Sequence, residues 1–430
     1  MLKSFRRVII LGTAVLVFSV FQVYKMQDSG IYRTNINDNA KNDAENVHVL
    51  INKLQHVAYK KISQNFSLGD SENKLDHEGS SHDMFCVEKS KWGNISGLPA
   101  VKSNMSVWEY KRNITCPDVQ FGETAPRPLR SKLVLNCDNV TDSVLKVEMV
   151  NNSNDIHVTK FGNACLNKFI DSCCKGPERV PNIVHYVWFM RNSLDFISFI
   201  SILSVVRFVN PCVIVFHGDR LPTGKYWDFL MRLSPNIIHI KRQKVNTVFG
   251  QRVKFKQHSS DVMRIEALLM YGGIYMDTDT VLVKSIDSLR QYPCVMSTQS
   301  GSLGSAFIMA EKNATFLNMW LEGYKTNYRS SHYYYNAMIY PRQLAYNHTD
   351  IIHVEDGTVS RPKDLYVNKP HSKRFESYNW SNIFGMHLFT RNTRTTFNED
   401  TIKDMRSVTG AILRHILFGN KELCHLLKTP

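Results

Sequence analysis

The segment formed by residues 258–287 constrains this chain more than any other, because it combines a helix pattern, a double glycine, a short strand and two carboxylates. Ser259 or Ser260 is placed to cap a helix whose first turn carries Asp261, where the helix dipole favours a carboxylate. Arg264 follows three residues later and is therefore a neighbour of Asp261 on the helix surface. Apolar residues at helical spacing give the helix one buried face, at Val262, Ile265 and Leu269.

A double glycine ends this helix and a carboxylate pair follows it. Gly272 and Gly273 predict the helix stop, because glycine readily adopts the positive φ angle found after many helices. Residues 274–276 predict a short strand, with Asp277 and Asp279 at its carboxyl end. Residues two apart in an extended chain point the same way, so both carboxylates are expected to face one hard cation. Magnesium or manganese bound to a diphosphate needs few protein oxygens, because phosphate and water supply the others.

Strands and helices alternate along the middle of the chain. Buried strands are predicted at residues 182–189, 213–216 and 237–240, with helices between them at 196–209 and 226–233. Such alternation implies an α/β fold with a mostly parallel central sheet and flanking helices, joined by right-handed crossovers. Ligands of such sheets bind beyond the carboxyl ends of the strands, and Asp277 lies at such an end.

The pattern is weaker in the last third of the chain. Further strands are predicted at residues 295–298, 306–310 and 383–389, and helices at 315–325 and 410–418. Three consecutive aromatic residues also occur here, at Tyr333, Tyr334 and Tyr335. Such a cluster either stacks on a sugar or belongs to the core or the rim of the fold.

The first residues predict a membrane anchor. Residues 8–24 form an apolar run near the shortest length that spans a bilayer. Lys3, Arg6 and Arg7 precede it and Lys25 follows it, which places the amino terminus in the cytosol and the remainder across the membrane. A signal anchor is favoured over a cleaved signal peptide, since no small-x-small site follows the run. The predicted organisation is a tail and anchor at residues 1–25, a stem and a cysteine-rich pre-domain at 26–178, and the α/β domain at 179–430.

Two further features favour a lumenal protein. Acceptor sequences for N-glycosylation are dense, at Asn65, Asn94, Asn104, Asn113, Asn139, Asn151, Asn313, Asn347 and Asn379. The nine cysteines show no metal-type spacing, so disulfides in an oxidising compartment are expected. They are Cys86, Cys116, Cys137, Cys165, Cys173, Cys174, Cys212, Cys294 and Cys424. Because nine is odd, at least one thiol is free or pairs with another chain.

The composition and net charge limit the classes of partner that are expected. With 43% hydrophobic residues, the chain of 430 residues can bury a sizeable core. Its formal net charge of +15 is consistent with a generally basic surface or with attraction for a nucleotide diphosphate. No basic run with interleaved aromatics is present, so nucleic acid is not expected as a partner.

The segment around the carboxylates resembles the DXD-type sugar transferases of glycosyltransferase family 32, which includes α-1,4-galactosyltransferases and α-1,4-N-acetylglucosaminyltransferases. The family's pattern is an Asp, an Arg three residues later, GGIY and D-x-D. It is met by Asp261, Arg264, Gly272, Gly273, Tyr275, Asp277 and Asp279. Residues 180–189 are similar to the family's opening strand, and the resemblance covers roughly residues 180–390. It implies a GT-A-like nucleotide-diphospho-sugar transferase fold and retaining transfer from a UDP-sugar.

The resemblance also implies a role for each matching residue. Asp261 and Arg264 hold the sugar and diphosphate side of the donor, and Gly273 and Tyr275 belong to the same donor-binding stretch. Asp277 contacts the ribose or a metal-bound water. Asp279 ligates manganese, or magnesium in its place. The residues implied to be catalytic are Asp277, Asp279 and Arg264.

Two implied contacts carry alternatives. Trp188 matches the aromatic residue that packs on the uracil, and a core position is its alternative. His387 falls where many animal members carry a His-x-Trp pair, and it would join Asp277 and Asp279 as a metal ligand. Phe389 stands where that Trp is expected, so a metal or phosphate contact and a satisfied core histidine both remain open for His387.

Together these features predict a single-pass type II Golgi membrane enzyme. It would be a retaining hexosyltransferase that moves a hexose or N-acetylhexosamine from a UDP-sugar to a glycolipid or glycan. The metal and Arg264 would stabilise the departing diphosphate, and no unambiguous nucleophile is visible, which favours same-face attack by the acceptor. One alternative is an inactive relative that acts as a lumenal carbohydrate-binding protein. Another is a DxDxT-type phosphatase with Asp277 as nucleophile, although that fold normally opens with this strand.

Overall fold

The computed structural model describes residues 146–150, 154–233, 236–362, 365, 369–374 and 378–424. The chain divides into two units, Met1–Gly79 and Ser80–Pro430, and all described residues belong to the second. The predicted anchor, the stem and most of the predicted pre-domain lie outside the described residues. Among the residues that are described, no helix is both long enough and apolar enough to cross a membrane.

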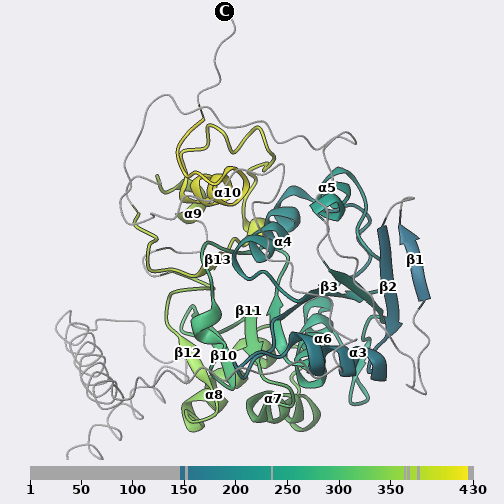
Figure 1. The fold of residues 1–430 in the computed structure, drawn as a ribbon. Coiled ribbons are helices and arrows are strands. Elements are labelled where there is room, and N and C mark those ends of the chain that lie inside the picture. Colours follow the sequence, from purple (N-terminus) through teal and green to yellow (C-terminus); the bar gives the residue numbers. More distant parts are fainter. Residues whose placement is uncertain are drawn as a thin grey trace, which may run out of the picture. The chain divides into compact units, whose positions relative to one another are not determined.

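One mixed sheet forms the centre of the described unit (Figure 1). Its strands are β1 (Lys146–Val150), β2 (Asn154–Lys160), β3 (Ile183–Trp188), β4 (Val213–Gly218), β5 (Ile237–Lys241), β8 (Gly273–Met276), β10 (Cys294–Gln299), β11 (Ser302–Ala310) and β12 (His353–Glu355). Within the described part of the chain their order is β1-β2-β5-β4-β3-β8-β11-β10-β12.

The sheet is parallel where it positions the site. Pairing is parallel from β2 through β5, β4 and β3 to β8, and it becomes antiparallel where β11 joins β8 and β10. β4 and β5 extend the sheet on one side of β3, whereas β8 lies on the other side, so the strand order reverses between β3 and β8. Open α/β sheets bind ligands beyond the strand ends at such a reversal. The predicted mostly parallel central sheet is confirmed.

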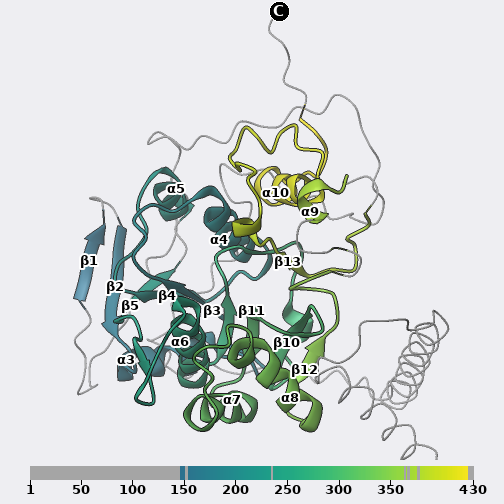
Figure 2. The same cartoon turned by 180° about the vertical axis from the view of Figure 1, so that it is seen from behind.

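Helices cover both faces of the sheet (Figures 1 and 2). On one face, α4 (Phe196–Phe208), α5 (Lys225–Leu233) and α10 (Val408–Phe418) share a core with alternate residues of β3 and β8. On the other face lie α3 (Ala164–Phe169), α6 (Lys256–Tyr271) and α7 (Thr315–Thr326). The two-residue period of a strand sends its successive side chains to these two cores. The predicted flanking helices are therefore present.

The remaining described elements are short and connect these layers. They are the π-helical turns η1 (Ile170–Cys174) and η3 (Tyr335–Ile339), the 3-10 turns η2 (Asp287–Leu289) and η5 (Thr390–Asn392), the strands β6 (Thr247–Val248), β7 (Gln251–Arg252), β9 (Thr280–Leu282) and β13 (Gly385–His387), and the helices α8 (Tyr340–Asn347) and α9 (Lys369–Ser372).

A small second sheet brings a late segment of the chain to the carboxylates. β13 pairs antiparallel with β9, which places His387 opposite Thr280. A Cβ on Gly385 would clash with the carbonyl oxygen of Val281, so this close approach requires glycine. His387 therefore arrives beside the D-x-D segment through the register of a strand pair.

The predicted elements between residues 182 and 325 are all present within a few residues of their expected limits, with one wrong start. α6 begins at Lys256, with Phe255 at its N-cap, and not after Ser259 or Ser260. The ring of Phe255 packs edge-to-face on His258 and on Tyr333, at centroid distances of 5.2 and 5.3 Å. These aromatic contacts hold an additional helical turn that the local capping pattern did not indicate.

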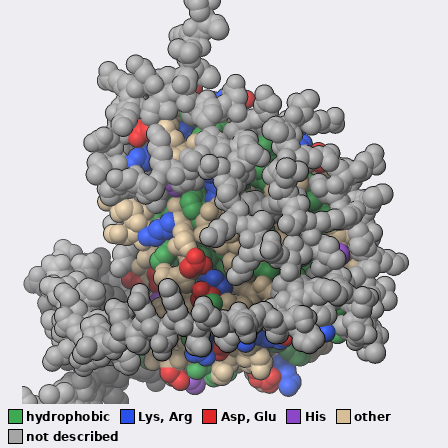
Figure 3. All heavy atoms as spheres, viewed as in Figure 1, with side chains coloured by type: hydrophobic (Ala, Val, Ile, Leu, Met, Phe, Trp, Pro, Cys, Tyr) green, Lys and Arg blue, Asp and Glu red, His purple; other side chains and the backbone are tan. Residues whose placement is uncertain are grey.

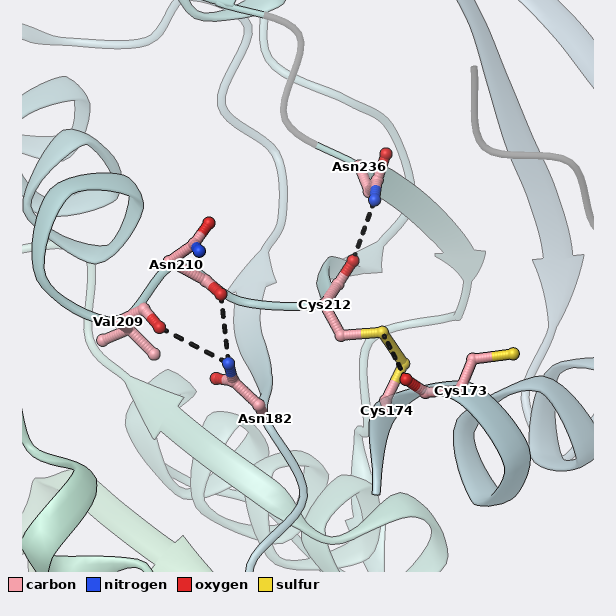
Figure 4. The surroundings of a disulfide bond; sticks show 7 residues. All are labelled: Cys173, Cys174, Asn182, Val209, Asn210, Cys212 and Asn236. Carbon is pink, nitrogen blue, oxygen red and sulfur yellow. Dashed lines mark hydrogen bonds between the residues drawn. A yellow bond between two sulfur atoms is a disulfide. The ribbon is translucent and has the colours of Figure 1, made fainter. Parts of the chain in front are cut away.

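The predicted disulfide chemistry is confirmed for one pair (Figure 4). Cys174 and Cys212 form a disulfide that joins η1 to the segment before β4, with Cα atoms 5.4 Å apart. Asn236 donates a hydrogen bond to the carbonyl of Cys212 at 3.0 Å. Cys294 is a buried free thiol, which agrees with one of the two outcomes expected from an odd number of cysteines. Three of the predicted glycosylation acceptors lie among the described residues with a known exposure, and all three are exposed, namely Asn313, Asn347 and Asn379.

Candidate active site

α6 presents a buried ion pair to the carboxyl end of the sheet. Nη2 of Arg264 lies 3.3 Å from Oδ1 of Asp261, as expected for residues three apart on a helix. Nη1 of Arg264 lies 3.3 Å from Oδ1 of Asp277, and its guanidinium covers the ring of Tyr275 at 4.4 Å. Arg264 therefore joins the helix to the D-x-D segment.

The charge of Arg264 is held by its surroundings. Burial lowers the pKa of Arg264, but the negative charge of Asp277 and of neighbouring groups outweighs burial, so the net pKa is raised. Burial also raises the pKa of Asp261, against the opposing charge of Arg264. The guanidinium donates to the backbone carbonyls of Ser260 and Ser305, which fix its plane. A permanently charged and oriented guanidinium suits the binding of a phosphate.

Asp277 stands at a turn that directs both carboxylates to one point. The backbone N–H of Thr280 donates to the carbonyl of Asp277 at 2.9 Å, so the segment is a turn and not the extended chain expected from the sequence. The ligand oxygens of Asp277 and Asp279 lie within 4.8 Å of one another, and a turn, not an extended segment, brings them together. The hydroxyl of Tyr275 donates to Oδ1 of Asp277 at 2.6 Å and holds that carboxylate. Tyr275 thus acts on the site through Asp277.

Asp279 and His387 form a close pair. Nε2 of His387 lies 3.0 Å from Oδ1 of Asp279, and the backbone N–H of Thr390 donates to Oδ2 at 3.3 Å. Burial raises the pKa of Asp279, but its interactions with His387 and Thr390 outweigh burial and leave the pKa lowered. Burial lowers the pKa of His387, but the charge of Asp279 outweighs it and leaves the pKa raised. Of the two alternatives for His387, the one near the metal agrees with this position.

The side chains fit a divalent cation. Asp277, Asp279 and His387 each offer one ligand atom, and these atoms lie within 4.8 Å of one another. Two carboxylate oxygens and one imidazole nitrogen suit Mn²⁺ better than Mg²⁺, because Mg²⁺ favours an all-oxygen shell. Three protein ligands leave coordination positions for phosphate oxygens and water.

Two pockets meet at this cluster. The larger, of about 350 Å³, lies between the end of β3, the start of α4 and the D-x-D turn, and it includes Arg191, Ser198 and Ser260. The smaller, of about 140 Å³, includes Asp261, Ser305 and Tyr334. The residues that line both pockets are Gln257, Arg264, Asp277, Asp279 and Arg391. Figure 3 shows acidic and basic side chains next to one another on the face that it presents.

Two of the predicted donor contacts, Trp188 and Gly273, line neither pocket among the described residues. Trp188 is 1% exposed, its Nε1 donates to the carbonyl of Arg191, and the Arg191 guanidinium lies 4.5 Å above its ring. The burial of the indole agrees with its core alternative. Gly273 has a φ of 104°, and a Cβ there would clash with Ile183, so this glycine serves the packing of β8 on β3.

Three pocket residues were missed by the sequence analysis. Gln257 lies four residues before Asp261 and seven before Arg264, so their common helix face was a usable signal. Arg191 and Arg391 follow β3 and β13, and no local pattern distinguishes them from other surface arginines. Only the fold brings both guanidinium groups to the same pocket.

The fold and the site together define a class. A buried arginine, two carboxylates and an imidazole, gathered where the strand order of an α/β sheet reverses, are typical of an enzyme that binds a metal-bound phosphate compound. Residues 210–296 match the family described as "Glycosyltransferase sugar-binding region containing DXD motif". That range contains Asp261, Arg264, Asp277 and Asp279. This region of the chain is thus similar to the sugar-binding region of DXD-type glycosyltransferases, as the resemblance predicted.

Curated relatives share part of the chain. Glucan organizing enzyme 1 of Cryptococcus neoformans var. grubii is 28% identical over 194 residues, which are 41% of this chain and 52% of that protein. Glycosyltransferase afumC of Aspergillus fumigatus is 27% identical over 117 residues, which are 23% of this chain and 30% of that protein. The chain thus spans about half, or less, of the length of these relatives. The solved structure of PaToxG Glycosyltransferase is 18% identical over 40% of this chain and 70% of that one, with a TM-score of 0.30.

Proposed function

We propose that this chain is a retaining hexosyltransferase with a GT-A-like fold. It moves a hexose or N-acetylhexosamine from a UDP-sugar to a glycolipid or glycan acceptor, with Mn²⁺ held by Asp277, Asp279 and His387. The observation that carries the proposal is the meeting of these three side chains with Arg264 at the junction of two pockets.

The lining of the two pockets supports the binding of the donor's nucleoside diphosphate in one pocket and of its sugar in the other. The larger pocket is lined by three arginines and several hydroxyl groups, which suit a nucleoside diphosphate, namely Arg191, Arg264, Arg391, Ser198, Ser260 and Thr278. The smaller pocket adds Asp261 and Ser305, whose oxygens suit the hydroxyl groups of the transferred sugar. The anomeric carbon then lies at the junction, close to Arg264 and the carboxylates.

The residues explain the departure of the diphosphate. A bound divalent cation supplies positive charge to the leaving oxygen. Arg264 adds a fixed, desolvated positive charge at the same place, and Tyr275 and Asp261 hold its guanidinium in position. Each of the carboxylates that line the smaller pocket is already paired among the described residues: Asp261 and Asp277 with Arg264, and Asp279 with His387.

Retention of configuration then follows from same-face attack. The acceptor oxygen forms its bond to the anomeric carbon on the face from which the diphosphate oxygen leaves. The acceptor proton passes to the departing phosphate oxygen, so no protein nucleophile is required. The pairing of Asp277 with Tyr275 and Arg264 also makes it a poor nucleophile, which argues against the phosphatase alternative.

The proposed location is the Golgi membrane, with the catalytic domain in the lumen. It is supported by the apolar run at residues 8–24, by the flanking cationic residues and by the density of glycosylation acceptors. The test is protease protection of the full chain in sealed microsomes, followed by treatment with an N-glycosidase. Digestion of the chain in intact vesicles, with no change in mass after glycosidase treatment, would contradict this location.

The activity is tested with the full chain purified in detergent. Thermal stability and donor hydrolysis are measured against UDP-glucose, UDP-galactose, UDP-N-acetylglucosamine and UDP-N-acetylgalactosamine, each with and without Mn²⁺. We expect one donor to raise the melting temperature and to be hydrolysed only with Mn²⁺, because a ligand that binds the folded state stabilises it. A folded chain that responds to none of these donors would support the inactive carbohydrate-binding alternative.

A further inference from the structure

We propose that Tyr334 is the platform on which the acceptor stacks, and that the acceptor group is a pyranose with an apolar face. This inference rests on the proposed transferase function and assigns the acceptor side of the same site. It separates one tyrosine from the run of three that the sequence presents as equivalent.

The two neighbours of Tyr334, Tyr333 and Tyr335, make contacts that stabilise the fold. Tyr335 is only 8% exposed, its hydroxyl accepts a hydrogen bond from Asn327 at 2.9 Å, and the Arg329 guanidinium lies 3.7 Å from its ring centroid. Tyr333 packs against Phe255 at the start of α6, and its hydroxyl accepts from Arg391 at 3.0 Å. Both rings therefore have structural contacts that account for them.

Tyr334 differs in its exposure: Tyr333 and Tyr334 both line the smaller pocket, but Tyr334 is 56% exposed whereas Tyr333 is only partly exposed. Its backbone is nevertheless fixed at the start of η3, where its carbonyl accepts from the N–H groups of Met338 and Ile339 at 3.0 and 3.2 Å. Its ring stands perpendicular to that of Tyr333, at a centroid distance of 4.7 Å. An aromatic side chain held in this way offers contact area with little loss of conformational freedom on binding.

The exposure of the pocket residues indicates which part of the smaller pocket holds the donor sugar and which part holds the acceptor sugar. Asp261, on the donor side, is 2% exposed, whereas Tyr334 lies at the rim of the same pocket. The transferred sugar must be inside before the acceptor hydroxyl can reach its anomeric carbon, so the outer position belongs to the acceptor. Met338 and Phe389 add apolar surface to this pocket. The C–H groups on one face of a pyranose form an apolar surface that complements the ring of Tyr334. The phenol hydroxyl of Tyr334 remains available for the polar groups of the sugar.

The test separates the acceptor from the donor. The full chain and its variants are supplied with Mn²⁺ and the UDP-sugar that the wild type hydrolyses, and transfer is measured to an array of immobilised pyranosides and, as a comparison, simple alkyl alcohols. For Tyr334→Ala we expect the acceptor KM to rise about tenfold more than the donor KM. Tyr334→Trp is expected to restore the acceptor KM, because it keeps a stacking surface, and Tyr334→Phe is expected to resemble the wild type.

Tyr346→Ala is the matched control. Tyr346 is 80% exposed on α8 and lines neither pocket, so its removal is expected to leave both KM values unchanged. Equal acceptor KM values for Tyr334→Ala and the wild type, with equal melting temperatures, would overturn the proposal that the acceptor stacks on Tyr334. Donor hydrolysis with transfer to alcohols but to no pyranoside would overturn the acceptor class and leave the transferase function intact. Failure of the wild type to hydrolyse any UDP-sugar would remove the proposed function, and this inference with it.

Discussion

The imidazole Nε2 of His387 lies 3.0 Å from Oδ1 of Asp279, although the two residues belong to distant parts of the sequence. Both residues also offer a ligand atom to the candidate metal site. A proton on His387 and a cation at the cluster are therefore expected to compete for this pair of side chains. The raised pKa of His387 and the lowered pKa of Asp279 are the signature of the protonated pair.

Manganese affinity is expected to rise with pH because of this competition. The negative charge of Asp279 raises the pKa of His387 above its ordinary value, so the proton that a cation must displace is held more tightly than on a free imidazole. Below its pKa, each pH unit is expected to weaken Mn²⁺ binding about tenfold, since one proton must leave. Isothermal titration in buffers of different ionisation enthalpy measures the proton released. His387→Gln should bind more weakly and lose the pH dependence, and an unchanged pH dependence in that variant would contradict the pairing.

Asp279→Asn is expected to remove the thermal response to Mn²⁺. The neutral amide is a poorer ligand than a carboxylate, and it also loses the ionic contact with His387. Stabilisation of the wild type should approach about 2.7 kcal/mol at a Mn²⁺ concentration 100-fold above Kd. Differential scanning fluorimetry with and without EDTA gives the comparison. Asp400→Asn is the control, because Asp400 is exposed, forms an ion pair with Lys403 three residues away and lines neither pocket. An equal Mn²⁺ response in the two variants would count against the site.

Arg264→Lys is expected to fold but to lose donor turnover. Lysine keeps the charge but cannot contact Asp261 and Asp277 together while donating to the carbonyl of Ser305. Loss of one oriented donor from a transition-state site costs on the order of 10²–10³ in kcat. Arg264→Ala should instead destabilise the fold by about 3–5 kcal/mol, since it leaves the buried carboxylate of Asp261 without its cation. Donor hydrolysis and urea unfolding of both variants distinguish these effects, and near-normal kcat in Arg264→Lys would argue that only the charge matters.

Stability is expected to fall as the pH drops below about 6.5, because His185 is buried as a neutral group. Burial lowers the pKa of His185 to about 4, and the pKa of its neighbour His217 is also lowered by burial. Nδ1 of His185 lies 3.0 Å from Nε2 of His217, and Nε2 of His185 lies 2.8 Å from the carbonyl of Gly272.

The direction of this pH dependence follows from proton binding. Between pH about 6.5 and about 4, His185 is protonated in the unfolded chain but not in the folded chain. The free energy of unfolding therefore falls by up to about 3 kcal/mol on account of His185 as the pH decreases through this range. Urea unfolding between pH 7.5 and 5 should show a smaller loss in His185→Gln than in the wild type. An equal loss in both would show that His185 does not contribute.

Local patterns in the sequence determined much of the fold and part of the site. Helical spacing was enough to pair Asp261 with Arg264, because residues three apart are always neighbours on a helix. Alternating strands and helices were enough for a mostly parallel sheet with a binding site at its carboxyl ends. Gly272, with a φ of 67°, ends α6 as expected.

Tertiary packing decided what spacing could not. α6 begins a turn early because Phe255 packs on Tyr333, and Trp188 is buried with the guanidinium of Arg191 above its ring. His387 reaches Asp279 only through the register of β13 with β9. Such contacts join segments that are far apart in the chain, so no local period records them.

The three consecutive tyrosines illustrate the same division. The sequence determined that aromatic rings stand at residues 333, 334 and 335. The structure decided that Tyr335 is buried, that Tyr333 binds Arg391 and that Tyr334 remains exposed at the pocket. The sequence places aromatic side chains in this segment. Which ring remains exposed to a ligand depends on the backbone turn at η3 and on the side chains that the rest of the fold packs against each ring.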